Sequence, residues 1–258
     1  AALIVSFLMV YFFRNETFDI GYLVFLQNFY DEIKFFKVSW SLCVEEHFYL
    51  LFVVFAFITS GLSKNKVITS WLIVCLVPLA LRIILGYNNY QEGFNFYATA
   101  SIFRIDGIAM GAFFAYLINN YTIKYRGKFI NNLVLLMTLI SIGLWISGEP
   151  SYFKYTLGYF LFVLNAAMLM VSLYYSSPVK IGETIFVKQI ALMAYSIYLT
   201  HAWVLNLFNI IHKKYSINDF IIVTSCLLII LVLGYLFYRS IEKPTINMRN
   251  NLLSKRNS

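Results

Sequence analysis

Charged residues are scarce in this sequence. Asp, Glu, Lys and Arg make up 12% of its 258 residues, whereas a soluble domain carries about 25%. Hydrophobic residues make up 60%, and they gather in runs close to the roughly 20 residues that a helix needs to cross a bilayer. The composition therefore excludes an ordinary soluble domain and predicts a polytopic membrane protein.

Motifs that hold metals or nucleotides are missing as well. The three cysteines, Cys43, Cys75 and Cys226, lie in apolar segments without the spacing of metal ligands, so we expect buried side chains and no metal site. The sequence has no P-loop, dinucleotide fingerprint or nucleophile elbow, and we expect no bound cofactor. The formal net charge of +8 does not indicate a nucleic-acid partner, because the basic residues lie between apolar runs and at the C-terminus, as in membrane proteins.

The apolar runs predict an all-α, integral membrane bundle of about eight transmembrane helices. The opening "AALIVSFLMVYFF" lacks the basic leader of a signal peptide and is too short to span, so we expect the chain to begin partway through a helix. The stretch 18–30 is short and polar at its end, which predicts an interfacial or re-entrant segment. The other predicted spans are 38–59, 67–87, 97–119, 129–147, 155–175, 188–211 and 217–240.

The basic residues also predict the orientation of the chain. Lys and Arg are about twice as numerous on the loops of one side as on the other, which places the C-terminus in the cytoplasm. We therefore expect a multi-pass protein of the inner (plasma) membrane. Residues 1–242 would form the membrane-embedded domain, and 243–258 a basic cytoplasmic tail lying against anionic lipid.

The stretch "WSLCVEEHFYLLF" places adjacent carboxylates at the start of a predicted span. On a helix Glu45 and Tyr49 share a face, whereas Glu46 points about 100° away. Ser41 lies near the start, where the helix would enter from the interface. The carboxylates could form a charged helix N-terminus at the water boundary, or one could turn inward as a base or a cation ligand.

A second group of charges lies in "SIFRIDGIAMGAFFAY". Arg104 and Asp106 are two residues apart and do not face each other on one helix. Each needs its own partner, and Glu45 or Glu46 would suit Arg104. The arginine could serve a structural ion pair or bind an anionic group.

Two further features have ordinary structural explanations, one in helix packing and one in a helix end. Gly107 and Gly111 form a G-x-x-x-G pattern, which lets another helix approach closely. Arg239, Glu242 and Pro244 close the last span, where we expect the proline to stop the helix and the cations to suit its C-terminal dipole.

The stretch "MAYSIYLTHAW" is rich in hydroxyl groups. Tyr195, Tyr198 and His201 recur at helical spacing, as do Ser196 and Thr200. His201 could be a hydrogen-bonded structural group, or the hydroxyl groups could form a polar cavity in which it acts.

Four segments together resemble a known family. They are, in this order, "WSLCVEEHFYLLF", "FRIDGIAMGAFFAYL", "AYSIYLTHAWV" and "YRSIEKP". Together they resemble the membrane-bound acyltransferase family 3, the bacterial O-acyltransferases of surface and secreted glycans. The resemblance implies transfer of an acyl group, commonly acetyl, from acyl-CoA to a sugar hydroxyl. Lipopolysaccharide, capsule, exopolysaccharide and peptidoglycan are all compatible acceptors.

The resemblance also implies that two further membrane spans precede this sequence. Family members carry, in their first span, a basic residue followed by a His central to acyl transfer, and an Arg-x-x-Arg motif before the third span. Neither is present, so the eight helices would correspond to spans three to ten. By this resemblance Glu45, Glu46 and His201 would be catalytic, the carboxylates supporting the missing His. The expected substrate-binding residues are Ser41, Tyr49, Arg104, Asp106, Tyr195 and Ser196.

Two other functions fit the residues. A transporter or flippase for a lipid-linked glycan would also need polar groups within spans and an outward mouth. Transporters often show internal repeats and helices broken by Gly or Pro, whereas here Pro78 alone interrupts a predicted span and no repeat is found, which favours the enzyme. The chain could also be an inactive fragment of the acyltransferase.

Overall fold

A computed structural model describes residues 19–30, 32–33, 37–89, 96–121, 127–146, 152–175, 184–215 and 217–256. These residues contain helices and turns and no strand, which confirms the predicted all-α membrane bundle. The chain divides into a larger unit, Ser6–Ser177, and a smaller unit, Ala1–Val5 with Pro178–Ser258. Each unit is described by itself.

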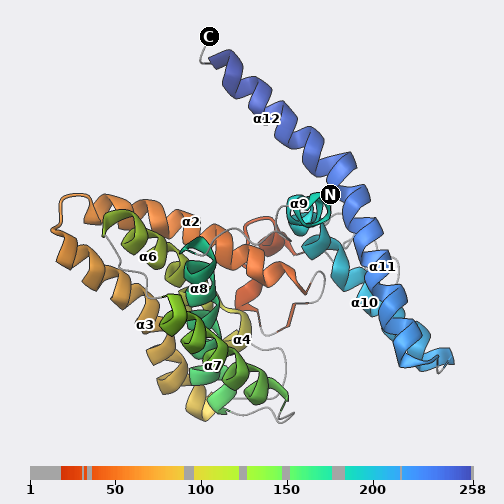
Figure 1. Cartoon of the computed structure of the whole chain (residues 1–258), viewed down its shortest axis with the longest axis horizontal. Coiled ribbons are helices and arrows are strands. Elements are labelled where there is room, and N and C mark those ends of the chain that lie inside the picture. Colours follow the sequence, from red (N-terminus) through yellow and green to blue (C-terminus); the bar gives the residue numbers. More distant parts are fainter. Residues whose placement is uncertain are drawn as a thin grey trace. The chain divides into compact units, whose positions relative to one another are not determined.

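The larger unit is a bundle of long apolar helices interrupted by short ones. In this unit α6 packs between α3 and α8, and α7 packs along α8 (Figure 1). Its elements are the 3-10 turns η1 (Ile20–Tyr22) and η2 (Gln27–Phe29), the helices α2 (Ser39–Thr59), α3 (Lys64–Asn89), α4 (Phe96–Thr99), α5 (Ser101–Arg104), α6 (Asp106–Asn120) and α7 (Gly127–Ile146), the π-helical turn η3 (Lys154–Gly158) and α8 (Tyr159–Tyr175).

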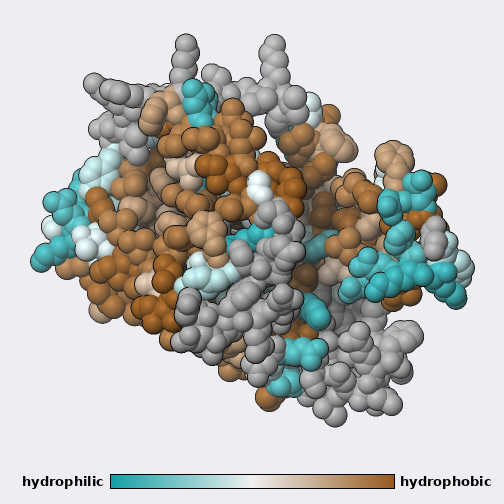
Figure 2. Space-filling view, turned by 90° about the horizontal axis from the view of Figure 1, so that it is seen from below, coloured by the Kyte–Doolittle hydropathy of each residue, from teal (hydrophilic) through white to brown (hydrophobic). Residues whose placement is uncertain are grey.

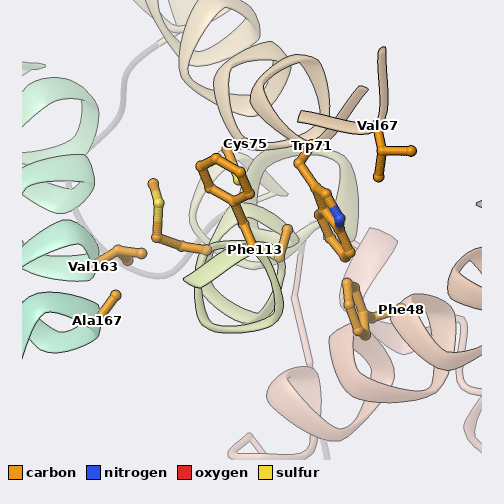
Figure 3. Packing of buried hydrophobic residues seen from close by; sticks show 9 residues of the cluster. Phe48, Val67, Trp71, Cys75, Phe113, Val163 and Ala167 are labelled. Carbon is orange, nitrogen blue, oxygen red and sulfur yellow. The ribbon is translucent and has the colours of Figure 1, made fainter. Parts of the chain in front are cut away.

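An aromatic and aliphatic core joins α2, α3, α6 and α8 (Figure 3). Trp71 of α3 lies at its centre, with its ring centroid 6.1 Å from that of Phe52 and 6.4 Å from that of Phe113. Cys75 is buried in the same cluster, and Cys43 and Cys226 are also buried and unpaired. The predicted role of the cysteines as small buried side chains is confirmed.

Most of the remaining apolar side chains face outward. Hydrophobic residues cover much of the described surface in Figure 2, and they include Phe57 at 82% exposed and Ile146 at 77%. A water-soluble protein of this size would not leave so many large side chains uncovered. The surface therefore matches a protein whose solvent is lipid.

Five helices are long and apolar enough to cross a membrane, or six if one bent pair counts as a span. They confirm five of the predicted spans: Ser39–Thr59, Lys64–Leu85, Phe129–Ile146, Lys154–Tyr175 and Asp219–Ser254. The opening half-helix lies outside the described residues.

The prediction of a single span at 97–119 is wrong. The segment breaks into α4, α5 and α6, with Ala100 in an extended conformation between the first two. A break frees backbone carbonyls that lipid cannot satisfy, and three side chains bind them. Asn28 donates to the Thr99 carbonyl at 3.2 Å, Arg104 to that of Ala98 at 2.6 Å, and Arg82 to that of Phe103.

The polar residues near 18–30 take part in this arrangement. Described from residue 19, the segment forms two 3-10 turns, as expected for a stretch that does not span. Gln27 and Asn28 are fully buried. Gln27 donates to Ser39 Oγ at 3.1 Å, at the start of α2. Their polar side chains therefore fix the start of α2 and the broken segment, which the sequence pattern did not show.

The smaller unit contains α9 (Ile185–Leu192), α10 (Ala194–Tyr215), α11 (Asp219–Phe237), the π-helical turn η5 (Tyr238–Glu242) and α12 (Lys243–Arg256). The predicted span at 188–211 is bent by 70° between α9 and α10. In contrast, α3 continues through Pro78, so the two broken segments lie elsewhere than the sequence indicated. Helices α10 and α11 lie side by side (Figure 1) and bury Val204, Cys226 and Ile230.

Two predictions about helix geometry are corrected. Pro244 does not stop the last helix, because α12 continues through it. The π-helical turn η5 ends at Glu242, shortly before this proline, and the Lys243 N–H bonds the Tyr238 carbonyl. The backbone hydrogen bonds are therefore already shifted by one residue there, so a residue without an N–H is tolerated. Of the two glycines in G-x-x-x-G, Gly107 faces Tyr159 and Val163 of α8, whereas a Cβ on Gly111 would meet nothing within 4 Å.

Candidate functional site

The larger unit places a histidine beside a serine hydroxyl at the break in 97–119. His47 Nδ1 lies 2.6 Å from Ser101 Oγ, and Asn28 Nδ2 donates to the same oxygen at 2.8 Å. The Ser101 hydroxyl can therefore donate its proton to His47 Nδ1, which leaves Nε2 of the neutral ring as a donor. The ring of Phe29 packs against His47 at 5.6 Å between centroids.

A helical spacing in the sequence indicates that His47 lies on a buried face of its helix. Ser39, Cys43 and His47 are spaced four residues apart, and the first two are 1% and 0% exposed. This spacing places all three on one buried face of α2.

The two carboxylates of α2 point in different directions, as predicted. Glu45 is half-buried and Glu46 is exposed, and Tyr49 is 56% exposed. Ser41 donates to the Val38 carbonyl at 3.3 Å, in the first turn. No cation of the described residues lies within ion-pair distance of Glu45 or Glu46, so the expected pairing with Arg104 is wrong.

Asp106 pairs with an arginine that sequence reasoning did not assign to the site. Asp106 Oδ2 lies 2.6 Å from Arg82 Nη2, and the two side chains are 0% and 3% exposed. Arg82 also donates to the Phe103 carbonyl. A lone arginine within the apolar helix α3 was the available signal, since intramembrane charges need partners. Asp106 is the counter-ion of Arg82, and its expected role in substrate binding stays a prediction.

Arg104 is held by aromatic rings rather than by a carboxylate. Its guanidinium lies 3.8 Å from the ring centroid of Tyr159 and 5.7 Å from that of Trp40. Arg82 lies 5.0 Å from the same Tyr159 ring. Arg104 Nε bonds the Ala98 carbonyl, and in the described part of the chain the Nη atoms of Arg104 have no hydrogen-bond partner. Arg104 therefore keeps donors that could bind an anionic group, and its binding role stays a prediction.

The smaller unit brings a serine and a glutamate together across two helices. Ser196 of α10 donates to Glu242 Oε2 at 2.6 Å, and Thr200 donates to the Ser196 carbonyl at 2.9 Å. Ser196 and Thr200 are buried, whereas Tyr195 is 50% exposed. The sequence pattern predicts that Glu242 belongs to a helix cap, because it does not show a partner that lies 46 residues away.

A backbone carbonyl of its own helix sets the tautomer of the neutral His201 ring. Its Nδ1 lies 2.5 Å from the carbonyl oxygen of Tyr198. A carbonyl only accepts, so Nδ1 carries the proton and Nε2 of the neutral ring keeps a lone pair. That lone pair can accept a proton. The catalytic roles of Glu45, Glu46 and His201 stay predictions.

Comparison with known proteins gives one group of relatives. The chain is 23% identical over 222 residues to the O-acetyltransferase OatA of Staphylococcus aureus, in strains NCTC 8325, COL and MRSA252 among others. The match covers 81% of this chain and 36% of each relative, so the chain spans about a third of their length. No family model and no solved structure matches it. The similarity supports an acyltransferase-like relationship for this membrane bundle.

Proposed function

We propose that the protein is a membrane-bound O-acyltransferase of family 3. It moves an acyl group, acetyl first, from acyl-CoA to a hydroxyl of a cell-envelope glycan. The similarity to an O-acetyltransferase over 81% of the chain carries this proposal. We further propose that the chain corresponds to spans three to ten of the family, and that the C-terminus is cytoplasmic.

The reaction needs a group that accepts a proton. The glycan oxygen attacks the thioester carbonyl, a C–O bond forms, the C–S bond breaks, and coenzyme A leaves as a thiolate that takes up the proton. If the 258 residues suffice for transfer, His201 Nε2 accepts the hydroxyl proton, because Nδ1 is held by the Tyr198 carbonyl. If the preceding spans are needed, the His that the family carries in its first span takes that role, and His201 supports it. A positioned base of this kind contributes roughly 10²–10⁴-fold to rate.

The test is the O-acetyl ester content of envelope glycans in a strain that lacks the gene. The strain is complemented with the 258-residue chain, or with the chain extended upstream to the start of its gene. Restored ester with either form supports the proposal, and restoration by the extended form alone shows that further helices are needed. Complementation that leaves ester absent with both forms, although both are in the membrane, overturns it.

A transporter for a lipid-linked glycan is the second candidate, and the broken helices favour it. Transporters build their binding sites from discontinuous helices, and here α4–α6 and α9–α10 are discontinuous. The two functions differ in their use of the donor. Purified protein that consumes labelled acetyl-CoA in the presence of glycan acceptors is an enzyme, whereas a transporter consumes none.

A further inference from the structure

A hollow of about 450 Å³ lies in the smaller unit, outside the groups described above. One wall comes from α9 and the other from the junction of α11, η5 and α12, which lie near each other in Figure 1. Its lining residues are Ile185, Gln189, Tyr235, Tyr238, Arg239 and Lys243. This volume lies within the range of roughly 300–1,000 Å³ that small-molecule sites occupy.

The spacing of the lining residues explains why they meet. Ile185 and Gln189 are four apart on α9, so they share one face. Tyr235, Arg239 and Lys243 follow the same spacing through the π-helical turn η5. Two helical faces thus oppose each other across the hollow. Single π-helical turns are frequent at functional sites.

The hollow carries two cations, Arg239 and Lys243. Among the described residues, neither has a carboxylate at salt-bridge distance. Arg239 Nη1 donates to the Tyr235 hydroxyl at 3.3 Å. The carboxylate of Glu242, although it lies between the two cations in sequence, is engaged by Ser196.

These groups suit a phosphate. An arginine fork, a lysine ammonium, two phenol hydroxyls and the Gln189 amide supply donors from both walls, and the cations match a doubly charged anion. Carboxylate ligands would need fewer donors. The basic loops place this end of the smaller unit on the predicted cytoplasmic side, where phosphorylated donors and anionic lipid headgroups are both present.

We propose that this hollow is a binding site for phosphate groups. As an extension that rests on the proposed function, the diphosphate and ribose phosphate of the acyl-CoA donor occupy it. The headgroup of an anionic lipid is the other source of the same chemistry. The lining phenols and Ile185 pack against the apolar part of either ligand.

The test measures binding of coenzyme A to the 258-residue chain in phosphatidylcholine nanodiscs, by titration calorimetry. Removing both charges, in R239Q/K243Q, should weaken binding about 100-fold, because each charge-assisted hydrogen bond to phosphate strengthens binding about tenfold. R239K/K243R should keep most of the affinity. R249Q, which removes an exposed charge of α12 outside the hollow, should change affinity less than about twofold, and pantetheine, which lacks phosphate, should not bind measurably.

A second arm uses nanodiscs containing phosphatidylglycerol and counts retained lipid by native mass spectrometry. If R239Q/K243Q no longer retains lipid but binds coenzyme A as the parent does, the phosphate site is upheld and the acyl donor is overturned as its ligand. Unchanged binding of both probes overturns the proposal, provided that the variant elutes as the parent does. If acetyl transfer continues at the parental rate in that variant, the acyl donor is overturned as the ligand of the hollow and the proposed function stands. If the hollow binds coenzyme A but no transfer occurs, the phosphate site stands and the proposed function fails.

Discussion

The two intramembrane arginines of the larger unit differ in what neutralises them. Arg82 is almost fully buried and bonded to Asp106 and the Phe103 carbonyl. Arg104 lies against Tyr159 and Trp40, which offer only the negative faces of their rings. Arg82 is therefore committed to structure, whereas Arg104 retains donors for a ligand.

Removing one partner of the Arg82–Asp106 pair should be strongly destabilising. Asp106→Leu leaves an uncompensated buried charge, which costs about 3–5 kcal/mol. The double variant R82M/D106L removes both charges and should recover much of that stability, because paired apolar replacements are often neutral. Unfolding in a denaturing detergent measures both. An Asp106→Leu variant as stable as the parent would show that water reaches the pair.

The two carboxylates of α2 should differ in their effect on activity. Glu45 is half-buried and Glu46 is exposed, so Glu45→Gln should lower acetylation by at least about tenfold and Glu46→Gln should leave it close to the parental level. O-acetyl ester released from envelope glycans is the measurement, with membrane levels of both variants as the control. Parental activity in both would leave only the role of a charged helix terminus.

Sequence patterns found the ionisable residues but not their partners. Helical spacing correctly separated Glu45 from Glu46, and it assigned polar roles to Arg104 and Asp106. The partners come from elements far apart in the chain: Ser101 for His47, Arg82 for Asp106 and Glu242 for Ser196. Such pairings depend on which helices pack together, and a single sequence does not contain that information directly.

The length of the apolar runs predicted the continuous helices well and the broken ones poorly. A continuous helix satisfies its own backbone, whereas a broken run is stable in a membrane only if other groups bind the freed carbonyls. In 97–119 those groups are Asn28, Arg82 and Arg104. The break is thus stabilised by polar side chains, two of them outside the run, which hydropathy ignores.

Gly234 sets how closely α10 and α11 approach. A Cβ there would overlap Ile197 Cγ1 and lie 3.2 Å from the Ile197 Cα, so Gly234→Ala forces the helices apart and should destabilise the smaller unit by about 1–3 kcal/mol. Thermal unfolding in a mild detergent is the measurement.

Gly111→Ala is the matched control. The same substitution in α6 meets nothing within 4 Å, so it should be neutral or stabilising by up to about 1 kcal/mol, through helix propensity. Equal destabilisation by both alanines would mean that Gly234 has no special role in packing.

The basic loops and the bent pair together predict the orientation of the chain in the membrane. We expect reporter fusions after Tyr175 and Ser258 to be cytoplasmic, with bright green fluorescent protein, and a fusion after Tyr215 to be external, with active alkaline phosphatase. That pattern would show that α9 and α10 cross the membrane together. Cytoplasmic signals from both Tyr175 and Tyr215 would identify the 70° bend as a re-entrant loop.

The buried ion pair also sets an order of events during synthesis. Arg82 leaves the ribosome 24 residues before Asp106, so α3 reaches the membrane with its charge unmatched. An arginine within a span is costly unless it is paired, and the partner arrives only at the start of α6. Lateral release of α3 into lipid should therefore wait for the segment that carries Asp106, which makes the two helices a single unit of membrane insertion.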